Sequence, residues 1–241
     1  MWPFTKYDSV SKSGVLQGMT DYHSHLLPGV DDGVKTVEES LQILARYEEL
    51  GIKAVWLTPH IMEDIPNATR HLKTRFHELA SLYKGNIRLN LAAEYMLDNL
   101  FASRLEDDDL LPIEKEGKRF LLVETSYFNS PLGLEATLKR IQARGYYPLL
   151  AHPERYEYMS KKEYRALKDM DIYFQLNLSA LGEMYGGRVK AKAEMLLKGQ
   201  MYDFVGMDVH SLHYLGVLVE APVKRKFLMS IMNELLSNAI G

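Results

Sequence analysis

The stretch Thr20-Asp21-Tyr22-His23-Ser24-His25 sets the organisation of this chain, because it reads as a strand that ends on two histidines. Alternate residues of a strand point to the same face, so His23 and His25 are expected to project together, as two ligands of one metal ion would. The acidic turn Val30-Asp31-Asp32-Gly33 follows. Such a pair alone also fits a partly buried strand end. Five later segments end an apolar run on His, Glu or Asp in the same way, which favours a metal centre.

The composition is that of an ordinary globular protein. Of the 241 residues, 46% are hydrophobic and 25% charged, and the net charge is −3 without a basic stripe, which argues against nucleic-acid binding. No apolar run approaches the length of a membrane span. The chain has no cysteine, which excludes disulfides, thiolate-bound zinc and a cysteine nucleophile. The N-terminus lacks the layout of a signal peptide, so a cytoplasmic location is expected.

Short apolar runs alternate with amphipathic stretches from Met19 onward, the pattern of α/β architecture. The runs 54–58 and 120–123 are almost continuously apolar, as buried parallel strands are. Seven β-α units without a break predict a barrel of parallel strands. The expected strands lie at 19–23, 53–58, 87–93, 119–124, 147–151, 172–177 and 203–208.

Helix signals fall between these runs. Thr36-Val37-Glu38-Glu39 and Ser160-Lys161-Lys162-Glu163 both read as capping boxes, and Ser130-Pro131 as another helix start. Gly51 stands where a C-cap glycine would end the first helix. The acidic run 106–109 lacks the spacing and glycine of a calcium loop, so it is expected to be a solvated turn.

The domain organisation follows from length and composition. Residues 1–18 are polar and contain Gly14 and Gly18, which predicts a loosely ordered N-terminal leader. Residues 19–241 show no interdomain linker and are expected to form a single domain, long enough to bury a full core.

Ligand-type residues gather at the expected strand ends. In parallel barrels, functional groups lie at the C-terminal ends of the strands. Each residue taken singly also reads as a solvated strand end, a helix cap or turn chemistry, but the joint pattern favours a site. Asn177 ends the sixth strand and is a candidate to hydrogen-bond to a ligand, whereas His71, His77 and His213 lie off the pattern. The nine candidate metal ligands are His23, His25, Asp32, His60, Glu94, Glu124, His152, Asp208 and His210.

This ligand set contains only nitrogen and oxygen donors, which favours Mn²⁺, Fe²⁺, Zn²⁺ or Mg²⁺. Nine candidates are too many for one ion and indicate a multinuclear site. Clustered divalent ions activate water and clamp a phosphoryl group, so hydrolysis of a phosphate ester is the chemistry that such a site serves best. Arg155 would hold phosphate oxygens in fork geometry; a surface ion pair with Glu154 or Glu157 is the alternative for this residue.

Three motifs resemble the polymerase-and-histidinol-phosphatase (PHP) superfamily. They are His23-Ser24-His25-Leu26-Leu27-Pro28-Gly29-Val30-Asp31-Asp32-Gly33, Thr58-Pro59-His60 and His152-Pro153-Glu154-Arg155-Tyr156. Within it, residues 19–240 look most like the bacterial manganese-dependent protein-tyrosine phosphatases that control capsule and exopolysaccharide synthesis. The resemblance implies an α/β fold, a distorted (β/α)₇ TIM-like barrel (the PHP fold), with a trinuclear metal site.

The resemblance also implies roles for residues. It makes all nine candidates metal ligands, with three Mn²⁺ ions as cofactors, and it makes Arg155 the residue that binds the phosphoryl group. Asp208 or His210 is then the candidate proton donor. The implied substrate is phosphotyrosine on a bacterial tyrosine autokinase. The aromatic residues expected on loops at the catalytic face either pack on the phosphotyrosine ring or pack the loops: they are Tyr127, Phe128, Tyr156 and Tyr158.

The chain departs from the family pattern in three places. The flank Ala92-Ala93-Glu94-Tyr95 matches only loosely, Ile61-Met62 replaces more polar residues, and the last motif reads Gly206-Met207-Asp208-Val209-His210.

Two alternatives stand beside the tyrosine phosphatase. One is a small-molecule phosphatase of the same superfamily, such as histidinol-phosphatase. The other is a non-catalytic module that binds a partner kinase or polymerase. This second alternative predicts missing ligands, whereas all nine positions are filled.

Overall fold

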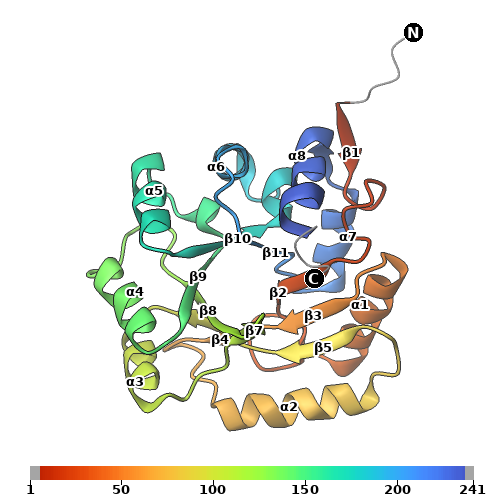
Figure 1. The fold of residues 1–241 in the computed structure, drawn as a ribbon. Coiled ribbons are helices and arrows are strands. Elements are labelled where there is room, and N and C mark those ends of the chain that lie inside the picture. The colour runs from red at the N-terminus through yellow and green to blue at the C-terminus, as the bar shows by residue number, and fades with distance from the viewer. Residues whose placement is uncertain (1–5, 237–241) are drawn as a thin grey trace.

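The computed structural model describes residues 6–236, in which parallel strands form a barrel ringed by helices (Figure 1). All seven expected strands are present. They are β2 (Thr20–Ser24), β3 (Ala54–Leu57), β5 (Arg88–Leu91), β8 (Lys118–Glu124), β9 (Tyr147–Ala151), β10 (Tyr173–Asn177) and β11 (Phe204–Gly206). The helices are α1 (Val37–Glu49), α2 (Thr69–Leu82), α3 (Asn99–Asp107), α4 (Leu134–Ala143), α5 (Lys161–Asp169), α6 (Gly186–Lys198), α7 (Leu212–Glu220) and α8 (Arg225–Ser230). In the described part of the chain, none of these is long and apolar enough to cross a membrane.

Five short strands were not predicted: β1 (Tyr7–Ser9), β4 (His60–Ile61), β6 (Glu94–Met96), β7 (Ile113–Lys115) and β12 (Pro222–Lys224). Two of them explain how the barrel is distorted. β4 continues β3 beyond Pro59, which has no N–H to donate, and pairs in parallel with β6. β6 in turn pairs with the C-terminal half of β8. β5 does not pair with β8; the first residues of β8 pair with the antiparallel β7 instead. The barrel is therefore continuous at its C-terminal end and split at its N-terminal end.

Backbone hydrogen bonds join the two edges of the barrel. The order β11-β10-β9-β8-β6-β4 makes one sheet and β2-β3-β5 another. Between β11 and β2, the Asp208 N–H donates to the His23 carbonyl at 2.7 Å and the His25 N–H donates to the Val209 carbonyl at 3.0 Å. The backbones of three candidate ligands, Asp208, His23 and His25, make these bonds, so closing the barrel also places these residues at the site.

An apolar cluster fills the barrel interior beneath the site. On β8, the alternate residues Phe120 and Leu122 point inward and pack with Leu149 and Phe204. Burying each of these side chains stabilises the fold by about 2 kcal/mol. Glu124 is the next residue in the same alternation, so its carboxylate stands on this apolar floor at the mouth of the barrel. A larger core lies between the strands and the surrounding helices.

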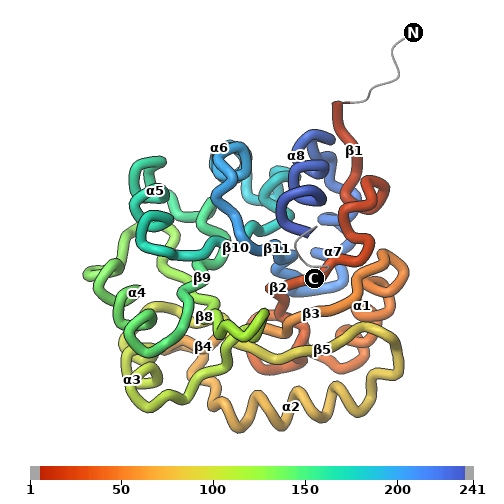
Figure 2. The backbone as a smooth tube through the Cα atoms, in the orientation of Figure 1, coloured from red at the N-terminus to blue at the C-terminus, as the bar shows by residue number. Residues whose placement is uncertain are grey.

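The expectation of a loosely ordered leader is wrong for residues 6–18; residues 1–5 lie outside the described residues. β1 pairs antiparallel with β12, and Figure 2 shows this first segment beside the last helices. Val15 and Leu16 are buried in the core. Three buried apolar side chains, Val10, Val15 and Leu16, anchor a segment whose composition is largely polar.

The helix signals were correct in most places. The Ser160 capping box forms fully, and Gly51 follows α1 with a φ of +83°. At the start of α1, Thr36 Oγ1 accepts from the Glu39 N–H, but the Glu39 carboxylate accepts from the Leu212 N–H at 2.9 Å and ties α1 to α7. α4 begins at Leu134, a turn later than Ser130-Pro131 suggests.

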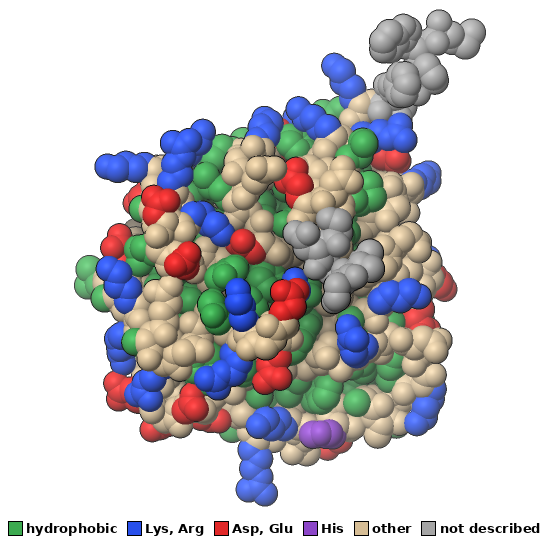
Figure 3. Space-filling model, viewed as in Figure 1, with side chains coloured by type: hydrophobic (Ala, Val, Ile, Leu, Met, Phe, Trp, Pro, Cys, Tyr) green, Lys and Arg blue, Asp and Glu red, His purple; other side chains and the backbone are tan. Residues whose placement is uncertain are grey.

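The acidic run 106–109 ends α3 and is exposed, as expected. On the face of the molecule shown in Figure 3, acidic and basic side chains are interspersed, in keeping with the small net charge.

Candidate metal centre

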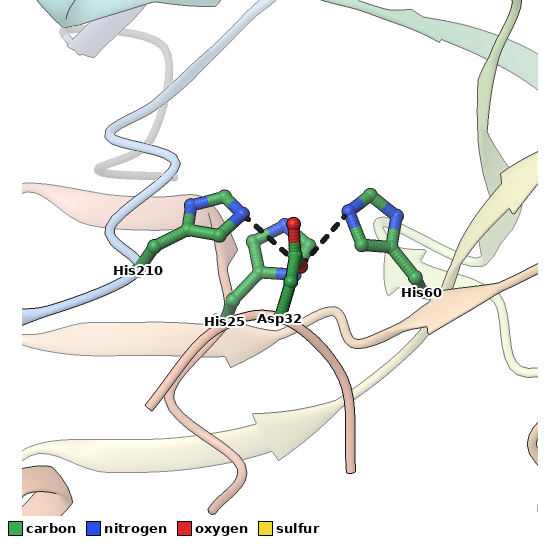
Figure 4. Close-up of side chains that lie close together, drawn as sticks. All are labelled: His25, Asp32, His60 and His210. Carbon is green, nitrogen blue, oxygen red and sulfur yellow. Dashed lines mark ion pairs between the residues drawn. The ribbon is translucent and has the colours of Figure 1, made fainter. Parts of the chain in front are cut away.

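The nine candidate ligands lie together at the mouth of the barrel. They form four overlapping groups, and the ligand atoms within each group lie within 4.8 Å of one another. The groups are His25–Asp32–His60–His210, His23–His25–Glu94, His23–His152–Asp208 and His60–Glu94–Glu124. Figure 4 shows Asp32 between His60 and His210, whose Nε2 atoms lie 3.5 and 3.6 Å from Asp32 Oδ1. The structure thus brings all nine together, and their role as ligands stays a prediction.

A register shift in β2 aims both histidines of the opening motif into the barrel. Tyr22 already points inward and packs edge-on against Phe204, so simple alternation would turn His23 outward. The pairing of β2 with β3 shifts between Asp21 and Ser24, and His23 then points inward as well. The Nε2 atoms of His23 and His25 lie 3.1 Å apart. The two histidines therefore project together, but through a bulge.

Two residues that sequence reasoning missed orient these imidazoles. Asp31 Oδ2 lies 2.8 Å from His25 Nδ1 and also accepts the His60 N–H at 3.0 Å. Gln175 Oε1 lies 2.9 Å from His23 Nδ1. Both contacts leave Nε2 free to face the centre, which fixes the ring nitrogen that a metal would meet. Burial alone would raise the pKa of Asp31, but His25 beside it holds this pKa well below its usual range.

Glu94 is the carboxylate on which the site converges. One or other of its oxygens lies 3.1 Å from His23 Nε2, 3.1 Å from His60 Nδ1 and 3.0 Å from His152 Nε2. Burial would raise the pKa of Glu94, but His23 and His60 hold it well below the usual value, so the carboxylate is ionised. The carboxylates in turn affect the histidine. Burial would lower the pKa of His23, but Glu94 and Asp208 raise it to about 9.

Left-handed backbone re-aims two of the candidates. His152 follows β9 with a φ of +34°, and Asp208 follows β11 with a φ of +54°. Such conformations cost of order 1–3 kcal/mol for residues other than glycine and are concentrated at functional sites. Asp208 is also held by Asn177, whose Nδ2 donates to Asp208 Oδ2 at 2.8 Å.

Buried atoms without hydrogen-bond partners show that these residues fit a cation. Among the described residues, His60 Nδ1, Glu94 Oε2 and His152 Nδ1 are three of the four buried side-chain atoms that make no hydrogen bond; His60 Nδ1 and Glu94 Oε2 lie 3.1 Å apart as an ion pair only. A buried polar atom without a hydrogen bond costs about 1–3 kcal/mol, and a cation bound between His60 and Glu94 would remove this cost for their two atoms. The nitrogen and oxygen donors suit Mn²⁺, Fe²⁺, Zn²⁺ or Mg²⁺.

Arg155 lies at the rim of this cluster. Its guanidinium is stacked between the rings of Tyr127 and Tyr185, 4.2 and 4.5 Å from their centroids, and its Nη1 lies 3.2 Å from Asp208 Oδ2. The alternative of an ion pair with Glu154 or Glu157 is not seen, because Arg155 pairs with Asp208 instead. Tyr185 was not singled out from the sequence, since nothing in the chain before α6 marks it.

The other aromatic residues expected at the catalytic face differ in how far they are buried. Tyr156 is buried and donates to the Ala151 carbonyl at 2.9 Å, so it packs the loop and does not reach a substrate. Tyr158 is half-buried, its hydroxyl 2.7 Å from Thr125 Oγ1, whereas Phe128 is 67% exposed. The three histidines that lie off the pattern are exposed, on α2 and α7.

Substitution of Gly206 by Ala is expected to loosen the centre. A methyl group there would overlap the His23 side chain and lie 2.7 Å from Gln175 Nε2. Overpacking of this kind costs about 1–3 kcal/mol, and it would displace His23 from its position. The checks are the thermal unfolding midpoint and the affinity for Mn²⁺. The matched control is Gly216→Ala, where the methyl group meets nothing within 4 Å. Equal midpoints and affinities in the two variants would contradict this account.

The fold and the site together define the class: a parallel β/α barrel with a mouth of histidines and carboxylates that can hold several divalent ions. A family model described as "Capsular polysaccharide synthesis, CpsB/CapC" matches residues 19–222, and the chain belongs to this family.

Relatives and solved structures agree with this assignment. The tyrosine-protein phosphatase CpsB of Streptococcus pneumoniae is 31% identical over 210 residues, covering 80% of this chain and 84% of that protein. The tyrosine-protein phosphatase YwqE of Bacillus subtilis is 25% identical over 201 residues, covering 80% and 78%. A crystal structure from the work on YwqE and CpsB, described as unique metal-dependent tyrosine phosphatases, superposes with a TM-score of 0.76 at 20% identity, covering 89% of this chain and 86% of that one. These matches confirm the expected barrel fold and the resemblance to the capsule-controlling phosphatases.

Proposed function

We propose that this chain is a metal-dependent protein-tyrosine phosphatase, with one domain over residues 19–241 against which residues 6–18 pack. The observation that carries the proposal is the convergence of nine nitrogen and oxygen donors beside a stacked arginine. A cysteine-dependent mechanism has no nucleophile here, since the chain contains no cysteine. The names of the relatives support the same assignment.

The nine candidate ligands would hold divalent ions, which when bound would lower the pKa of a water and offset charge on the phosphoryl oxygens. The side chains do the rest. Arg155 binds phosphoryl oxygens with its guanidinium plane fixed by Tyr127 and Tyr185. Burial would raise the pKa of Asp208, but His23 and other nearby histidines hold it well below its usual range, so Asp208 is ionised and acts as an acceptor. Burial and the nearby His25 lower the pKa of His210 below its usual value, so this imidazole is neutral near pH 7 and neither of the two candidate proton donors is a strong acid there.

The finer assignments extend the same proposal. We take Mn²⁺ as the native metal, with three ions, as the resemblance to the manganese-dependent phosphatases implies; the four ligand groups share members, which fits fewer than four ions. The substrate is phosphotyrosine on a protein, for which a bacterial tyrosine autokinase of polysaccharide synthesis fits the family. The cytoplasmic location stays a prediction.

The test is hydrolysis of p-nitrophenyl phosphate and of a phosphotyrosyl peptide by chelator-stripped protein, with each divalent ion added back separately. We expect no turnover without metal, recovery that is best with Mn²⁺, and a higher kcat/KM on the peptide than on histidinol phosphate. The reverse preference would favour the small-molecule phosphatase. Metal-loaded protein that hydrolyses no aryl phosphate would support the non-catalytic module.

A further inference from the structure

A second hollow lies directly beside the proposed centre. It has a volume of about 270 Å³ and runs from the turn that follows β9 to the first turns of α6. We call it the flank pocket; its lining includes Arg155, Tyr185, Arg188 and Lys192. Arg155 and Tyr185 form the wall towards the metal centre, since Arg155 pairs with Asp208 and Tyr185 stacks on it. A molecule held by Arg155 is thus in reach of the flank pocket.

Two basic side chains of the pocket, Arg188 and Lys192, come from one face of α6. Residues four apart on a helix lie on the same side, which places Arg188 and Lys192 together. Arg188 is exposed and makes no ion pair with any described residue. Lys192 Nζ donates to the backbone carbonyls of Tyr156 and Glu157, which holds the ammonium group at the pocket. Lys190, between them in sequence, pairs with Glu183 at 2.9 Å instead.

The acidic residues of the pocket do not cancel this charge. Glu154 is buried, and its two oxygens accept from the Asn177 N–H and the Tyr202 hydroxyl, each at 2.9 Å. Glu157 is exposed and is the one lining carboxylate left to oppose Arg188 and Lys192, since Arg155 is already paired with Asp208. An unpaired arginine in a hollow of a protein with net charge −3 indicates a site for an anion.

We propose that the flank pocket binds a second anionic group of the substrate, a carboxylate or a phosphate carried by a residue near the phosphotyrosine. This inference rests on the proposed function. Successive residues of an extended peptide are spaced about 3.3 Å apart, so a residue one to three positions from the phosphotyrosine reaches a hollow that shares Arg155 with the centre. Arg188 binds such a group in fork geometry and Lys192 adds a charge. The pocket therefore selects phosphotyrosines in acidic surroundings.

The test compares kcat/KM on phosphotyrosyl peptides that differ at one flanking position. A single Asp, a second phosphotyrosine, Lys or Ala is placed at each position from −3 to +3. We expect the metal-loaded wild type to prefer the best acidic peptide to its Ala counterpart by about tenfold, the size of one charge-assisted contact. In Arg188→Ala, the ratio of kcat/KM on the acidic peptide to that on the Ala peptide should fall towards one. Arg188→Glu should reverse the preference, so that the peptide with Lys at the flanking position is hydrolysed better than the acidic peptide. The aspartate and phosphotyrosine arms show which anion the pocket takes.

Lys190→Ala is the matched control, because it removes a charge from the same helix but outside the pocket lining; it should keep the wild-type ratio. A wild type that hydrolyses acidic and neutral peptides equally would overturn the inference. So would an Arg188→Ala variant that keeps the full preference, or a Lys190→Ala variant that loses it equally. A loaded wild type that hydrolyses no phosphotyrosyl peptide at all would overturn the proposed function itself, and the inference with it.

Discussion

Replacing Glu94 by Gln is expected to lower kcat on p-nitrophenyl phosphate by about 10³-fold or more and to reduce the bound metal. The variant keeps the size of the side chain but removes its charge. Glu94 belongs to two of the four ligand groups and lies within 3.4 Å of His23, His25 and His60. A metal cluster supplies several kcal/mol of charge stabilisation, and each 1.4 kcal/mol is tenfold in rate. Loss of this shared carboxylate therefore affects more than one ion.

The measurements are kcat in saturating Mn²⁺ and the metal content of dialysed protein. The control is Glu114→Gln, since Glu114 is an exposed carboxylate on β7 at the opposite end of the barrel. It should match the wild type in both measurements. If Glu94→Gln kept its metal and its turnover, the site would have to be built without its most central carboxylate.

The strands that sequence reasoning found are those whose pattern is set by burial along their own length. β8 and β9 are buried on both faces over several residues, and such runs are visible without knowledge of their neighbours. β4 and β6 are two and three residues long, and they are strands only because β4 pairs with β6 and β6 pairs with β8. No local sequence pattern indicates this pairing. The split of the barrel at its N-terminal end was invisible for the same reason.

The candidate site was more predictable than the fold details, because the rule that places it concerns only where strands end. The residues that were missed do not face the centre themselves but orient another residue of the site by a hydrogen bond or by stacking. Gln175 lies two residues before Asn177, so alternation along β10 could have marked it as facing the interior. Asp31 and Asp32 are neighbours in a turn, and only the fold decides that Asp31 is the buried one that orients His25. The stacking of Tyr185 on Arg155 joins two loops 30 residues apart in the sequence, 155 to 185.

Replacing Arg155 by Ala is expected to lower kcat on p-nitrophenyl phosphate by about 10³-fold while leaving metal content unchanged. An arginine that stabilises the transition state of phosphoryl transfer is worth 10³-fold or more. Arg155 has the position for this role, since its guanidinium is held between two aromatic rings and pairs with Asp208 Oδ2 at 3.2 Å. None of the four ligand groups includes it, so the metal centre keeps all its donors.

Two further variants separate this role from a merely structural one. Arg155→Lys keeps the positive charge but loses the planar fork and the stacking on Tyr127, so we expect it to recover only a part of the lost rate. Arg165→Ala removes an exposed arginine from α5 and should behave as the wild type. The loss in Arg155→Ala should be of similar size on p-nitrophenyl phosphate and on peptides, unlike that in Arg188→Ala, because Arg155 contacts the phosphoryl group that all substrates share. Wild-type turnover in Arg155→Ala would remove this residue from the mechanism and leave the metal ions as the sole source of charge stabilisation.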